Sequence, residues 1–183
     1  MDSCGVETGQ QNGAISLRRF AADIAELQSA VRELSDRAEI SRLIDRYVVL
    51  LDVQDEDGFD AGWPTTIFTD DVRMHFPIGT VHGIENVAEF HHAAKVKFDR
   101  TLHVGASHDI TLTGDVARVR MHVVATHVHA PLPEAADRIG PLFDIGGYYS
   151  GEAVRTRLGW RLREWGFHLV WADGPGPGGT PVM

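Results

Sequence analysis

The sequence predicts an α+β domain, in which helices come first and a meander of long antiparallel strands follows. Up to residue 51, apolar residues recur at three- and four-residue spacing, as on one face of a helix. From Phe68 onward the pattern becomes strand-like. Gly114-Asp115 and Gly159 lie between long strand-like segments and predict tight hairpin turns. Helices followed by such a meander are typical of a sheet with its helices on one face.

Each element follows from these patterns. Helical runs are predicted at 17–34 and 40–51, and whether Ser35-Asp36 divides them is open. A short helical piece is expected before Gly62-Trp63-Pro64, and another helix at about 84–98. The apolar stripe of the first run consists of Leu17, Phe20, Ile24, Leu27, Val31 and Leu34. The predicted strands are 72–77, 80–82, 101–113, 115–130, 143–157 and 160–172.

Composition predicts one folded domain. The chain has 183 residues, of which 43% are hydrophobic, enough for a single core. Residues 1–16 are rich in Gly, Gln and Ser and are expected to be disordered. Residues 174–183 are rich in Pro and Gly and are expected to form a disordered tail. The domain is therefore expected to cover 17–173.

Charge and motifs exclude several classes of function. A net charge of −9 argues against a nucleic-acid partner or an anionic membrane surface, because both require a basic patch. The single cysteine, Cys4, cannot form an internal disulfide. The sequence has no signal peptide and no apolar run long enough to span a membrane, so a cytoplasmic protein is expected. Without a Gly-rich phosphate loop or clustered metal ligands, no nucleotide, other cofactor or metal is predicted.

Two of the ten histidines attract attention by their strand positions. His127 shares strand parity with an apolar row from Ala117 to Ala125, so its side chain is expected to point inward. It is either a buried histidine satisfied by a carboxylate or carbonyl, or a pocket residue. By simple alternation, His103 lies on the strand face opposite to that of the apolar residues around it. Either a bulge near Gly105 exchanges the faces, or the apolar set forms an oligomer interface.

The other candidates are weaker from the residues alone. His91 and His92 lie next to each other on the helix and are expected to be solvated or partly buried, and His122 is expected to face outward. Asp52, at the end of the second helical run, lies on the flank of the apolar stripe. From sequence alone, a solvated carboxylate is favoured for Asp52.

Four blocks together resemble SnoaL-like domains of the nuclear-transport-factor-2-like superfamily, over about residues 36–172. They are DRAEISRLIDRYVVLLDVQD with FTDDVRMHF, VHGIENVAEF, RTLHVGASHDITLTGDVARVRMHVVATHVH, and GGYYSGEAVRTRLGWRLREW. The resemblance implies a cone-shaped α+β barrel of curved antiparallel sheet with N-terminal helices on one face. Members of this superfamily are commonly dimers or trimers, so a homodimer or homotrimer is expected.

In the scytalone-dehydratase-like branch, an aspartate at the end of the long helix faces two histidines. The matching residues are Asp52, His103 and His127, and the Asp–His pair of related dehydrochlorinases matches the first two. A histidine titrates near neutral pH, and a carboxylate on its other nitrogen fixes its tautomer. Two tyrosines of the dehydratases are replaced here by Leu51 and Phe76, so their mechanism does not transfer intact. Tyr47, Tyr148 or Tyr149 either supplies a hydroxyl instead or is a packing residue with a polar tip.

The resemblance therefore implies a cofactor-free acid–base enzyme, a dehydratase or cyclase acting on a hydrophobic, polyketide-like small molecule in a biosynthetic pathway. In this interpretation one histidine is the base and the other donates a proton or a hydrogen bond. The alternatives are a non-catalytic binding or oligomerising member of the fold, and an epoxide-opening enzyme. Tyr47, Trp63, Phe76, Met121 and Tyr148 are the predicted substrate-binding residues.

Overall fold

The computed structural model describes residues 6–53, 59–133 and 140–177, with side chains from residue 17 onward. The chain forms two units, residues 1–38 and residues 39–183. One helix, α1 (Val6–Val53), belongs partly to each unit, and it continues without a break through Ser35-Asp36. Residues 6–16, expected to be disordered, are helical. Once a helix has formed, each added residue gains a backbone hydrogen bond, which offsets the weak helix propensity of the glycines there.

The apolar stripe of the first unit is exposed. Its six side chains are between 38% (Ile24) and 71% (Leu17) accessible to solvent. The spacing correctly predicted the helix, but spacing alone does not indicate what covers an apolar face. The compact unit that contains the sheet begins at Glu39, later than the predicted domain start at residue 17.

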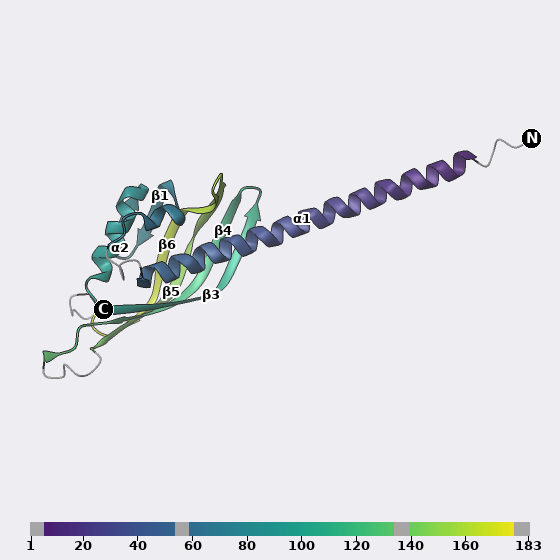
Figure 1. The fold of residues 1–183 in the computed structure, drawn as a ribbon. Coiled ribbons are helices and arrows are strands. Elements are labelled where there is room, and N and C mark those ends of the chain that lie inside the picture. Colours follow the sequence, from purple (N-terminus) through teal and green to yellow (C-terminus); the bar gives the residue numbers. More distant parts are fainter. Residues whose placement is uncertain (1–5, 54–58, 134–139, 178–183) are drawn as a thin grey trace, which may run out of the picture. The chain divides into compact units, whose positions relative to one another are not determined.

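The second unit is built on one curved, unclosed sheet of six strands in the order β2-β1-β6-β5-β4-β3 (Figure 1). Strands β3 to β6 form the predicted antiparallel meander. Strand β1, however, pairs with β6 in parallel, so the sheet is mixed rather than wholly antiparallel. Hairpin turns determine which neighbours are antiparallel, but β1 joins the free edge of β6 through a contact distant in sequence. The strands are β1 (Phe68–Phe76), β2 (Gly79–His82), β3 (Arg100–Thr113), β4 (Val116–Val128), β5 (Leu142–Thr156) and β6 (Gly159–Asp173).

The turns and short helices mostly follow the sequence pattern. Gly114 (φ +61°) closes the β3–β4 hairpin and Gly159 (φ +92°) the β5–β6 hairpin, both in the left-handed region that glycine tolerates. The 3₁₀-helix η1 (Trp63–Thr66) begins where a helical piece was expected to end, with Pro64 in its first turn. The helix predicted at 84–98 is shorter, comprising the 3₁₀-helix η2 (Ile84–Asn86) and α2 (Val87–Lys95).

The core of the second unit lies between the end of α1 and the sheet. Ile40, Ile44 and Tyr47 on α1 are fully buried, as are Met121 on β4 and Leu162 on β6. The end of α1 reaches the start of β3, where Asp52 is hydrogen-bonded to Thr101 and His103. Helix α2 packs against Phe76 of β1 through Phe90 and His91. Over the described residues, no helix is long and apolar enough to cross a membrane.

Candidate active site

A β-bulge resolves the conflicting parity of His103. The β3–β4 register shifts between Ala106 and Asp109, and Ser107 has a positive φ of 60°. Before the bulge, His103 faces inward while Leu102 and Val104 are 61% and 57% exposed; after it, Ile110 faces the core. The bulge therefore exchanges the faces, as the first alternative required, although it lies past Gly105. The second alternative, an oligomer interface formed by the exposed residues, stays a prediction.

Asp52 lies behind His103 and is held by three hydrogen bonds. Its Oδ1 accepts from His103 Nδ1 at 2.7 Å and from Thr101 Oγ1 at 2.7 Å, and its Oδ2 accepts from the His103 backbone N–H at 2.9 Å. The side chain is only 17% exposed, so the interpretation as a solvated carboxylate was wrong. Burial alone would raise the pKa of Asp52, but the hydrogen bonds and charge of His103, together with Thr101, hold it below its ordinary value.

These bonds determine which nitrogen of His103 is free. A carboxylate can only accept, so Nδ1 carries the proton toward Asp52. In the neutral ring, Nε2 is then left with a lone pair. Lys95 Nζ also donates to the backbone carbonyl of Asp52, which ties the end of α1 to α2.

His127 lies next to this pair but is bonded differently. Its ring centroid is 5.5 Å from that of His103, and its Nδ1 lies 3.1 Å from the carbonyl oxygen of Phe143. Burial, with a smaller effect from the charge of His103, lowers the pKa of His127 to about 4. Near neutral pH the ring is therefore neutral, with Nδ1–H donating to the carbonyl and Nε2 unprotonated. Both interpretations of His127 hold, because it is satisfied by a carbonyl and also lines a cavity.

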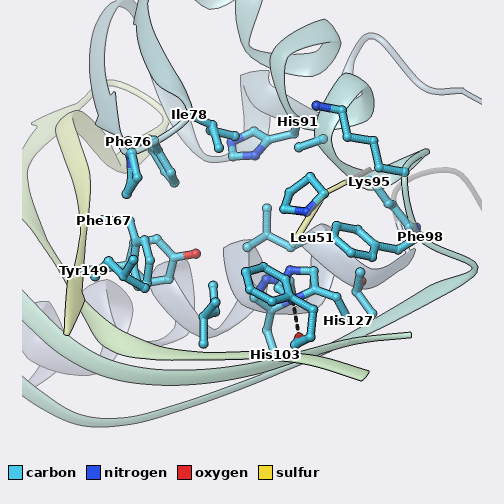
Figure 2. A pocket seen from close by; sticks show the side chains of 18 residues that line it. Leu51, Phe76, Ile78, His91, Lys95, Phe98, His103, His127, Tyr149 and Phe167 are labelled. Atoms are coloured by element: carbon cyan, nitrogen blue, oxygen red, sulfur yellow. Dashed lines mark hydrogen bonds between the residues drawn. The ribbon is translucent and has the colours of Figure 1, made fainter. Parts of the chain in front are cut away.

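The two histidines open on a cavity of about 260 Å³ with mainly apolar walls. Figure 2 shows His103 and His127 on one side of it, and Phe76, Tyr149 and Phe167 on another. The Tyr149 hydroxyl points into the cavity. The remaining lining residues are Leu51, Pro77, Ile78, His91, Ala94, Lys95, Lys97, Phe98, Thr101, Phe143, Ile145, Leu169 and Pro177.

Of the five predicted substrate-binding residues, only Phe76 lines this cavity. Tyr47, Trp63 and Met121 lie in the core, at most 3% exposed, because their helix, turn and strand positions point between the layers. Tyr148 lies on the outer face, where it stacks on His168 with ring centroids 4.6 Å apart. Side chains alternate along β5, so its neighbour Tyr149 takes the inward position.

The sequence interpretation missed His91. It was expected to be solvated or partly buried, yet it is 7% exposed and lines the cavity, while His122 is exposed as predicted. The helical spacing of Val87, His91 and Ala94 contained the signal, because i, i+4 and i+7 share one face. The ring packs among aromatic side chains, namely Tyr47, Trp63, Phe76 and Phe90.

His91 should make the protein sensitive to acid. Burial, and secondarily the charge of His103, lowers the pKa of His91 to about 3. Because the folded-state pKa lies below the ordinary value, the unfolded chain binds the extra proton first. Stability is then full above about pH 6.5 and falls toward pH 3, by up to about 1.4 kcal/mol per pH unit. His91→Phe should flatten this dependence in urea unfolding measured from pH 7 to pH 4.

The matched control for this prediction is His122→Phe, on the exposed face of β4. It should leave the slope of unfolding free energy against pH as in the wild type. A slope that stays unchanged in His91→Phe would contradict the buried, neutral state of His91.

The beginning of the expected tail also contributes to the site. Pro177 lines the cavity, and the carbonyl oxygen of Pro175 lies 2.7 Å from His129 Nε2. Residues 174–177 are thus held against the sheet, contrary to the expectation of a tail disordered from residue 174. Residues 178–183, the rest of that tail, lie outside the described residues, as do residues 134–139.

Comparison with known proteins identifies the family of this chain. A model of the SnoaL-like domain matches residues 32–166. The chain belongs to this family. Among curated proteins, no match was found. Among the described residues, no group of three or more His, Cys, Asp or Glu side chains could hold a metal ion.

Solved structures share the SnoaL-like fold. The Kfla4162 protein of Kribbella flavida is 27% identical, with a TM-score of 0.67 over 77% of this chain and 95% of that one. A candidate scytalone dehydratase of Novosphingobium aromaticivorans is 18% identical (TM-score 0.62; 82% and 91% covered). The hexachlorocyclohexane dehydrochlorinase LinA-type3 of Novosphingobium barchaimii is 19% identical (TM-score 0.62; 82% and 97% covered). The last two names describe enzymes that carry out eliminations.

Proposed function

We propose that the protein is a cofactor-free acid–base enzyme that catalyses an elimination on a small hydrophobic substrate. The observation that carries this proposal is the Asp52–His103 pair at the wall of an apolar cavity. A carboxylate-backed imidazole with a free Nε2 is suited to removing a proton from carbon. The elimination chemistry named for the dehydratase and the dehydrochlorinase supports the same reaction class.

His103 is the base in this proposal. Its Nε2 takes a proton from the carbon next to a carbonyl or similar electron-withdrawing group, and Asp52 stabilises the imidazolium that results. The electrons of the broken C–H bond form a double bond as the bond to the leaving group on the neighbouring carbon breaks. When hydroxide leaves, the His103 imidazolium returns the proton to it, so that water is released and the base is restored.

His127 has a different role from that of a proton donor. Its Nδ1 proton is directed to the Phe143 carbonyl and its pKa is about 4, so near neutral pH it has no proton on Nε2 to give. It is instead suited to accepting a hydrogen bond from a substrate hydroxyl.

Tyr149 is the donor for the substrate oxygen. Leu51 and Phe76 both line the cavity without a hydroxyl, whereas Tyr149 directs one into it. Burial raises the pKa of Tyr149, so the hydroxyl stays protonated and can stabilise negative charge that develops on a carbonyl oxygen.

The cavity favours a small substrate. Its volume of about 260 Å³ lies below the range of about 300–1,000 Å³ typical of drug-sized ligands. We therefore favour a hydroxy ketone with one or two rings, as in a polyketide-like intermediate, over a large polycyclic compound. Epoxide opening is disfavoured because both carboxylate oxygens of Asp52 already accept hydrogen bonds.

A panel of one- and two-ring β-hydroxy ketones tests the proposal. In D₂O, the protein should catalyse exchange of the proton next to the carbonyl, seen by NMR, and form the conjugated enone, seen by ultraviolet absorbance. Thermal shift identifies which compounds bind. If compounds that bind undergo neither exchange nor elimination, the protein is a binding member of the fold and the proposal is wrong.

A further inference from the structure

The exposed apolar stripe of the first unit has the spacing of a coiled-coil seam. Its six residues, Leu17 to Leu34, are separated by three, four, three, four and three positions. This alternation has a period of 3.5 residues and fills the a and d positions of three successive heptads. A globular helix that packs once against a sheet has no need of so strict a period.

The stripe is not buried by the described residues. Leu17, Phe20, Leu27, Val31 and Leu34 are each more than 60% exposed. Helices in water owe most of their stability to the packing of an apolar face, so a helix with this stripe exposed lacks its main source of stability. A continuous apolar stripe on a surface marks an interaction site.

The residue types indicate what covers the stripe. The a positions include the β-branched residues Ile24 and Val31, and the d positions include Leu27 and Leu34. This distribution favours a coiled coil of two parallel helices of the same sequence, aligned in register. In a second copy of the chain, the same a and d side chains lie at the same levels along the helix, so the side chains of the two helices can interdigitate.

The residues that flank the seam also permit this pairing. In a parallel pair, each g position faces the e position of the following heptad on the partner helix. Here Asp23 would face Gln28, and Ala30 would face Ser35, so no like charges meet within the stripe. Arg37 is already paired with Glu33 on its own helix at 2.8 Å.

We propose that residues 17–34 form a parallel two-stranded coiled coil with the same residues of a second copy of this chain. The pairing uses only the first unit and does not depend on the proposed function. It joins two copies of the chain through their first units.

Disulfide trapping of the full chain tests this arrangement. With Cys4 replaced (Cys4→Ser), Leu34→Cys should give mostly disulfide-linked dimer under mild oxidation, because identical d positions face each other. Leu27→Cys, a second d position, should behave in the same way. The matched control is Ser29→Cys, an exposed f position on the outside of the pair, which should stay monomeric on a non-reducing gel.

Two results would overturn the proposal. One is cross-linking of Leu34→Cys and Leu27→Cys no greater than that of Ser29→Cys. The other is efficient cross-linking between Leu17→Cys and Leu34→Cys chains in a mixture, which would indicate antiparallel helices. The substituted leucines are exposed in the single chain, so these variants are expected to fold.

Discussion

His103→Asn is expected to lower kcat/KM by about 10²- to 10⁴-fold on any substrate that the enzyme converts, because it removes the general base. The asparagine amide can occupy the place of Nδ1 and still donate to Asp52, so the hydrogen bond that holds the end of α1 is retained. Only the cavity-facing Nε2 is lost. Steady-state kinetics, together with proton exchange in D₂O, measures the effect.

The matched control is His122→Asn, on the outer face of β4. It should leave kcat/KM within about twofold of the wild type, since exposed substitutions seldom disturb a site. Binding of a ground-state ligand, followed by thermal shift, should persist in His103→Asn. If His103→Asn keeps its turnover, another group must be the base, and the proposed mechanism with His103 as the base is wrong.

The sequence predicted the local elements well, because their signals are local. The Gly114 and Gly159 hairpins and the inward face of β4 follow from turn chemistry and period two. The parallel pairing of β1 with β6 does not, since it depends on which distant strand reaches a free edge. The exposure of the 17–34 stripe was not predictable for a similar reason. Helical spacing identifies an apolar face but does not show which surface packs against it.

The site was predictable only in part, for a comparable reason. The alternation of side chains along its strand correctly predicted that His127 points inward. The inward position of His103 depends on a bulge between Ala106 and Asp109, and no residue there indicates where the bulge lies. Tyr148 was chosen over Tyr149 because two adjacent tyrosines leave the inward one undecided until the register with β4 is known. The family resemblance brought Asp52 into the set, whereas its residue context alone favoured solvent.

Asp52→Asn is the sharpest test of how the base is maintained. The aspartate accepts hydrogen bonds on both oxygens, from the His103 ring and from the His103 backbone N–H. An amide has only one oxygen, and in Asp52→Asn this oxygen accepts the hydrogen bond of the His103 backbone N–H, whose position is fixed by the strand. The amide NH₂ then faces the ring nitrogen, which favours the tautomer with the proton on Nε2. The base is blocked by its own proton, and kcat/KM should fall by about 10²- to 10⁴-fold.

Two measurements separate this tautomer effect from simple damage to the fold. The ¹⁵N shifts of His103 should move from the Nδ1–H to the Nε2–H pattern in Asp52→Asn. The pKa of Asp52 lies below its ordinary value in the folded protein, so its ionisation stabilises the fold above about pH 4, and this contribution is lost as the pH falls further. Urea unfolding of Asp52→Asn should lack that acid-dependent component.

Thr101→Val, which removes one hydrogen bond but keeps the carboxylate, should retain the tautomer and most of the activity. An Asp52→Asn enzyme with wild-type turnover would mean that the carboxylate only fastens the end of α1.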